Sequence, residues 1–231
     1  MRKILGWLGI AARSRAGSPA YEPYAESPAN FMYNLLFCDD LAAFKPAGGE
    51  PQAPFATLFA EPPQVAELEK LAADPAQEGR LRYLAFSRLR ALGQAVPSGI
   101  LLGVIAEVPL PKGLDALAAY SEGGVRYINQ TGKITILEGV AGIQPLVQRV
   151  FAASKVIVER IGPWDKSRLA PPDRTGTVRL SFLVSDGLYF GQGPMKTMLA
   201  DAAAGPVIAA AITLLKAIAQ LPPGSGQSPA Q

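Results

Sequence analysis

Residues 114–139 read LDALAAYSEGGVRYINQTGKITILEG, and this stretch predicts a β-meander. Two turn sequences, SEGG at 121–124 and TGK at 131–133, flank the segment VRYINQ, whose residues alternate between the two sides of a strand. Before the meander, the sequence GILLGVIAEV at 99–108 is an almost continuous apolar run. A run of this length and composition favours a strand that is buried on both faces of its sheet.

The segments around the meander complete the predicted set of elements. The sequence TVRLSFLVSDGLYFGQG at 177–193 predicts a second hairpin, because Asp186-Gly187 is a typical two-residue turn. Apolar residues at helical spacing predict four helices, over 64–74, 78–93, 145–162 and 206–220. The last of these is apolar almost all round, which is typical of a helix buried in a core.

We therefore expect an α+β fold with a central five- or six-stranded antiparallel sheet. The sheet consists of the β-meander plus the hairpin, helices pack on it, and an αα-hairpin precedes it. In topology alone, this order is similar to small sensory and scaffold folds of the profilin, roadblock and PAS kind. A fold of this class does not by itself specify a function.

Composition divides the chain into four parts. We expect a basic and apolar N-terminal tail at 1–17, a Pro/Gly-rich arm at 18–63, a single α+β domain at 64–221 and a disordered tail at 222–231. The arm is expected to pack over the domain through its aromatic residues. Within the arm, Asn30 is expected to cap a short helix.

The positive charge of the chain belongs to its first residues. The chain has 22 Lys and Arg against 19 Asp and Glu, a formal net charge of +3 and a pI near 9.0. Arg2, Lys3, Arg13 and Arg15 give the tail a charge of +4, which leaves 18 basic and 19 acidic residues, or −1, for the rest. A near-neutral body argues against a nucleic-acid partner, which requires a dense basic surface.

The N-terminal tail has the pattern of an interfacial helix. Ile4, Leu5, Trp7 and Leu8 lie between basic residues and predict contact with a membrane surface. The expected location is cytoplasmic, with membrane association through these residues. Two alternatives stay open: a loosely ordered N-terminus, and export by a weak N-terminal signal. The signal is weak because Arg13 lies where a small residue should precede the cleavage site.

The residue counts exclude several kinds of catalysis. The chain has no histidine and a single cysteine, so a His-based triad, an HExxH zinc site and an intrachain disulfide are excluded. The segment 191–197 lacks the spacing of a phosphate-binding loop, and residues 39–40 lack that of a calcium loop. We predict no catalytic residue, no metal site and no cofactor.

Polar and aromatic residues gather in the predicted strands and in the aperiodic loop at 162–176. If helices leave one sheet face open, these residues would form a recognition surface, because Arg and Tyr are frequent at binding hot spots. The predicted members are Tyr120, Arg126, Tyr127, Asn129, Trp164, Asp165, Arg179, Asp186 and Tyr189. The alternative is that Arg126 and Arg179 form cross-strand pairs with Glu122, Glu138 or Asp186 on a solvated face.

These patterns favour a non-enzymatic module for protein interaction, sensing or scaffolding, whose partner is another protein. One alternative is a small His-independent hydrolase or transferase that uses carboxylates, with Asp115, Glu138, Asp165 and Asp186 as candidates. Another is a weak nucleic-acid binder that uses the four arginines between Arg80 and Arg90, although a solvated helix face is the simpler interpretation of them.

Overall fold

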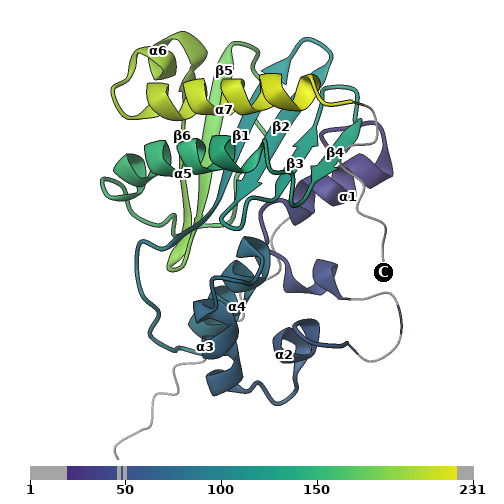
Figure 1. Ribbon diagram of the computed structural model, residues 1–231, viewed down its shortest axis with the longest axis vertical. Coiled ribbons are helices and arrows are strands. Elements are labelled where there is room, and N and C mark those ends of the chain that lie inside the picture. Colours follow the sequence, from purple (N-terminus) through teal and green to yellow (C-terminus); the bar gives the residue numbers. More distant parts are fainter. Residues whose placement is uncertain (1–19, 46–47, 49–50, 223–231) are drawn as a thin grey trace, which may run out of the picture.

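In a computed structural model of the protein, which describes residues 20–45, 48 and 51–222, six strands form one antiparallel sheet. The strand order across the sheet is β4-β3-β2-β1-β5-β6 (Figure 1). The strands are β1 (Leu101–Leu110), β2 (Gly113–Tyr120), β3 (Val125–Ile128), β4 (Ile134–Leu137), β5 (Thr177–Val184) and β6 (Gly187–Pro194). The α+β prediction, with a meander and a hairpin in one antiparallel sheet, is confirmed.

Strand β1 lies inside the sheet, where it pairs with β2 on one side and with β5 on the other. Its side chains alternate between two cores: Ile105 packs in the core on one face and Val104 in the core on the other. Burial on both faces explains why the sequence of β1 is almost continuously apolar.

Three helices, which we call the helical layer, lie on one face of the sheet (Figure 1). They are α5 (Gln144–Val158), α6 (Met195–Ala200) and α7 (Ala204–Ala219). Pro145 lies in the first turn of α5, where its missing N–H costs no helical hydrogen bond. The core under this layer includes Val147, Val150, Phe182, Val207 and Leu214.

The expectation that the last helix is buried in a core holds for one side of α7 only. In α7 one stripe of side chains packs in the core, whereas Ala209, Ile212 and Lys216 are exposed. The physical reason is that α7 lies in the outermost layer, with the sheet below it and α5 and α6 as its neighbouring helices. Its outer face therefore meets solvent although it is apolar.

The arm and the αα-hairpin cover the other face of the sheet. The arm forms α1 (Ser27–Leu35), a 3₁₀ turn (Leu41–Phe44) and α2 (Phe55–Phe59), and the hairpin consists of α3 (Val65–Ala73) and α4 (Gly79–Ala91). Arm residues share one core with the hairpin and the sheet, among them Tyr33, Phe37 and Leu58.

Two expectations about local structure need correction. Asn30 does not cap α1: the helix begins at Ser27, and the Asn30 side chain bonds to the backbone N–H and C=O of Tyr24, at 2.8 Å each. The arginines of α4 do not form a solvated face. Arg82 donates to the Ala72 carbonyl at 3.0 Å, and Arg88 donates to the carbonyls of Leu58 and Ala60.

Across the residues that the structure describes, no helix combines the length and the apolar character that a membrane span requires. The tail residues Ile4, Leu5, Trp7 and Leu8 lie outside the described residues, so their role stays a prediction.

The first residue of α4 tests how tightly the hairpin docks on the sheet. A Cβ added at Gly79 would clash with the Leu102 carbonyl and would lie 2.8 Å from Ser121 Oγ. We expect Gly79→Ala to lower the free energy of unfolding by about 1–3 kcal/mol, because the helix must shift away from the strand. Urea denaturation measures the change. Gly142→Ala is the matched control, since nothing lies within 4 Å of its Cβ, and an equal loss in both variants would contradict the tight approach.

Candidate functional site

The structure divides the predicted recognition residues between the two faces of the sheet. Tyr120, Arg126 and Arg179 belong to the face covered by the arm, where they are at most 5% exposed. Tyr127 and Tyr189 pack on the opposite face, under the helical layer. The sheet thus does not bring these five side chains together, and both of its faces are covered.

Arg126 forms an ion pair of the kind given above as the alternative to a recognition role. Its guanidinium pairs with Glu138 at 2.5 Å and approaches Glu78 at 3.5 Å, so it joins β3 to the segment after β4 and to the start of α4. The predicted cross-strand partner Glu138 is confirmed. The arginine side chain is buried, however, and does not lie on a solvated face. Tyr120 donates its hydroxyl to the Leu36 carbonyl at 3.0 Å and so helps to hold the arm.

The remaining predicted residues lie in turns and in the loop before β5. The Asn129 side chain accepts hydrogen bonds from Thr131 and Lys133 and closes the β3–β4 turn. Tyr189 donates to Asp186 at 2.9 Å beside the β5–β6 turn.

Trp164 and Asp165 belong to the loop before β5. The ring of Trp164 packs edge-on against Phe190, with the ring centroids 4.9 Å apart. Asp165 is exposed in the same loop. A recognition role for the nine residues stays a prediction.

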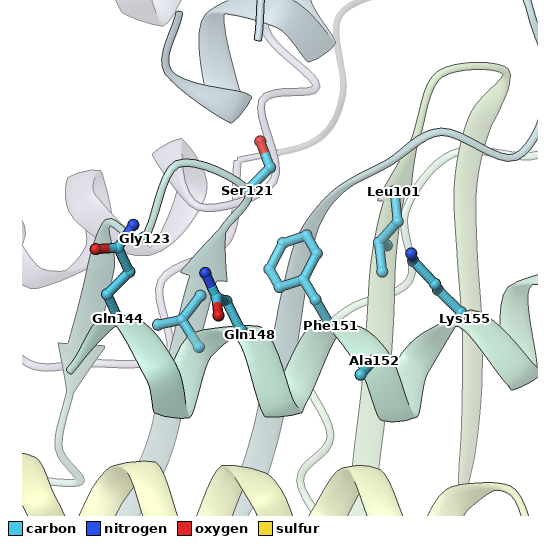
Figure 2. Close-up of a pocket in the computed structure, with 9 residues that line it drawn as sticks. Leu101, Ser121, Gly123, Gln144, Gln148, Phe151, Ala152 and Lys155 are labelled. Carbon is cyan, nitrogen blue, oxygen red and sulfur yellow. The ribbon is translucent and has the colours of Figure 1, made fainter. Parts of the chain in front are cut away.

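A groove runs along α5 on the flank away from α7 (Figure 2). Its volume is about 370 Å³, and it lies between α5, the first residue of β1 and the turn between β2 and β3. Its lining consists of Leu101, Ser121, Gly123, Gln144, Val147, Gln148, Phe151, Ala152 and Lys155. We call it the α5 groove.

Four α5 side chains define the chemistry of the groove. Gln144, Gln148, Phe151 and Lys155 follow one another at helical spacing, and Figure 2 shows them projecting from the same side of α5. Phe151 supplies apolar surface together with Leu101, the two glutamines supply amide donors and acceptors, and Lys155 supplies positive charge. The lining contains no carboxylate, so the groove offers an apolar site with one cationic end.

Sequence reasoning missed this groove. The signal was present, because Gln144, Gln148, Phe151 and Lys155 occupy every third or fourth position beside the apolar stripe of the same helix. What the sequence does not show is that the strand ends opposite this stripe leave space.

A group of polar side chains is also buried between the sheet and the arm. Glu107 lies on β1 with an exposed fraction of 0% and accepts a hydrogen bond of 2.7 Å from the Tyr33 hydroxyl. Arg179, its cross-strand neighbour on β5, places Nη1 at 3.8 Å from Glu107 Oε2. Burial raises the pKa of Glu107, and the positive charge of Arg179 opposes that shift. Burial likewise raises the pKa of Tyr33, and the nearby Glu107 carboxylate adds to that rise.

Arg168 ties the loop before β5 to the arm. Its Nε donates to Asp39 at 2.7 Å and its Nη2 to Asn34 at 3.0 Å. The guanidinium also lies 4.1 Å from the ring centroid of Phe37 and 4.9 Å from that of Tyr21. Stacking and hydrogen bonds of this kind use the planar geometry of arginine.

Three of the four carboxylates proposed for catalysis bond to partners of their own. Asp115 accepts from Tyr127 and from the Gln130 backbone, whereas Glu138 pairs with Arg126 and Asp186 accepts from Tyr189. Among the described residues, no group of three or more His, Cys, Asp or Glu side chains is placed to hold a metal ion. Cys38 is buried, and burial raises the pKa of its thiol, which disfavours the reactive thiolate.

The buried carboxyl makes a pH-dependent contribution to stability. A raised pKa means that the folded chain holds the Glu107 proton more tightly than the unfolded chain, so this contribution is complete below the ordinary glutamate pKa and is lost as pH rises through the raised pKa. The quantity to compare is the free energy of unfolding of the wild type minus that of Glu107→Gln. We expect this difference to fall from about pH 4 to about pH 7. The fall should be about 1.4 kcal/mol for each tenfold difference in proton affinity between the folded and unfolded chains. Urea denaturation across this range measures it, and a constant difference would contradict the buried environment.

The arginine that ties the loop to the arm gives a separate test. Arg168→Met should lower the free energy of unfolding by about 3 kcal/mol or more, because Asp39 loses its partner in a largely buried place. Arg168→Lys should be intermediate, since it keeps the charge but not the planar fork. Arg174→Met, at an exposed arginine of the same loop, is the control and should change the value by less than about 0.5 kcal/mol. Similar losses at both positions would show that Arg168 is no special anchor.

Comparison of the chain with known protein families, with curated proteins and with solved structures gives no match. The topological likeness to profilin, roadblock and PAS folds therefore gains no support from a relative.

Proposed function

We propose that the protein is a non-enzymatic interaction module of α+β type, with a sensory or scaffold role, whose protein partner binds in the α5 groove. The observation that carries this proposal is the lining of the groove: apolar surface from Leu101 and Phe151, two glutamine amides, and a lysine as its only charged group. Pockets of this composition bind through apolar contact and use a few polar groups for orientation.

The lining indicates what kind of segment the groove accepts. An apolar side chain would pack on Phe151, and a neighbouring carboxylate would pair with Lys155. The amides of Gln144 and Gln148 can donate to and accept from the backbone of an extended segment. We therefore propose a partner segment in which an apolar residue lies next to Asp or Glu.

Two alternative functions have less support. Carboxylate catalysis needs two carboxylates that converge, and the described lining of the groove contains none. Nucleic-acid binding through α4 needs free arginines, but Arg82 and Arg88 are engaged with backbone carbonyls of the protein itself. A cytoplasmic location, with membrane association through the tail, remains part of the proposal.

Selection from a random peptide library tests the proposal. The wild-type protein should enrich peptides with an apolar residue beside Asp or Glu. Phe151→Ala should weaken binding of a selected peptide about tenfold, because the contact surface of the ring is lost. Lys155→Glu should abolish binding, and replacing the acidic residue of the peptide by Lys should restore it. Fluorescence anisotropy measures each affinity.

Arg149→Glu is the matched control, because this residue is an exposed cation of the same helix outside the groove lining. It should leave peptide affinity unchanged. If both charge reversals weaken binding equally, or if no peptide shows the charge swap, the groove is not the binding site.

A further inference from the structure

The helical layer carries positive charge without a carboxylate in any of its three helices. Arg149 lies on α5, Lys196 on α6 and Lys216 on α7, and all three side chains are exposed outside the α5 groove. Within the part of the chain that the structure describes, none of the three forms an ion pair. These charges therefore remain available to an external anion.

Two carboxylates border the layer without neutralising it. Asp201 lies between α6 and α7, and its Oδ1 accepts hydrogen bonds from the backbone N–H groups of Ala203 at 2.9 Å and Ala204 at 2.8 Å. Glu159 directly follows α5 and is itself followed by Arg160. The outer surface of the layer thus keeps an excess of positive charge.

Aliphatic side chains are exposed on the same three helices. Val156 of α5 is 40% exposed, Leu199 of α6 is 45% exposed and Ile212 of α7 is 39% exposed. None of the exposed side chains of these helices is aromatic, since Phe151 is half-buried in the α5 groove. Hot spots for folded protein partners are enriched in Trp and Tyr, so this composition does not favour a protein here.

Cations interspersed with a few aliphatic side chains suit the surface of an anionic bilayer. The cations attract the headgroups, and the aliphatic side chains enter the boundary between headgroups and acyl chains. The layer also presents three neighbouring helices on one side of the sheet (Figure 1). We propose that the outer surface of α5, α6 and α7 docks on an anionic membrane, separately from the groove and from the N-terminal tail.

Vesicle sedimentation with the full chain tests this proposal. The wild type should bind phosphatidylcholine vesicles that contain phosphatidylserine better than phosphatidylcholine alone, and binding should weaken as salt rises. Arg149→Glu combined with Lys216→Glu should lower partitioning about tenfold or more, because two attractive charges become repulsive. Val156→Ser combined with Ile212→Ser should weaken binding at high salt, where the apolar contribution dominates.

The matched control reverses two exposed cations on the arm side that form no ion pair with a described residue, Lys45→Glu with Lys133→Glu, and should bind like the wild type. Circular dichroism establishes that each variant is folded, as expected for surface substitutions. Because every variant keeps the N-terminal tail, unchanged binding of Arg149→Glu/Lys216→Glu would assign binding to the tail and overturn the proposal. Failure of the wild type to bind either vesicle would overturn it as well, as would equal weakening by the control pair.

Discussion

The carboxylate of Glu107 constrains the architecture on one side of the sheet. It lies on β1, which pairs with β2 and with β5, and no part of it reaches solvent. A buried carboxylate without partners is too costly to keep, so Tyr33 must donate to it and Arg179 must lie nearby. Tyr33 belongs to the arm, so the arm can satisfy this carboxylate only when α1 is docked.

Arginines then connect the remaining segments to this docked arm. Arg168 brings the loop before β5 to Asp39 and Asn34. Arg88 brings α4 to the carbonyls at the end of α2, those of Leu58 and Ala60. Each guanidinium donates to several acceptors at once. The arm needs such donors because it has few regular elements to satisfy its own backbone carbonyls. These arginines therefore act within the protein, and little of their charge is left for a partner.

The sheet could be predicted because its local signals agree: the turns at 121–124 and 131–133 and the apolar run at 99–108 each predict strands. The helices around the sheet could be predicted as elements, but their individual contacts could not, because those join residues distant in sequence. Periodicity does not show that α7 has only one covered side, or that Arg82 turns toward Ala72. For the buried pair of Glu107 and Arg179, the one local indication in the sequence was Glu107 itself, a lone charged residue within an apolar strand. The α5 groove could not be predicted without knowing that Leu101 lies opposite the helix.

The two sides of the sheet leave different surfaces for function. On the arm side, charges such as Arg126 and Glu138 neutralise each other within the protein. On the helical side, α5 presents Lys155 and Phe151 on one flank and Arg149 and Val156 elsewhere on its exposed surface. Since the groove lies on the flank away from α7, a segment bound there would leave the outer surface free. If both proposals hold, one rigid helix would bind a protein segment while the same layer contacts a bilayer, which would concentrate that partner at the membrane.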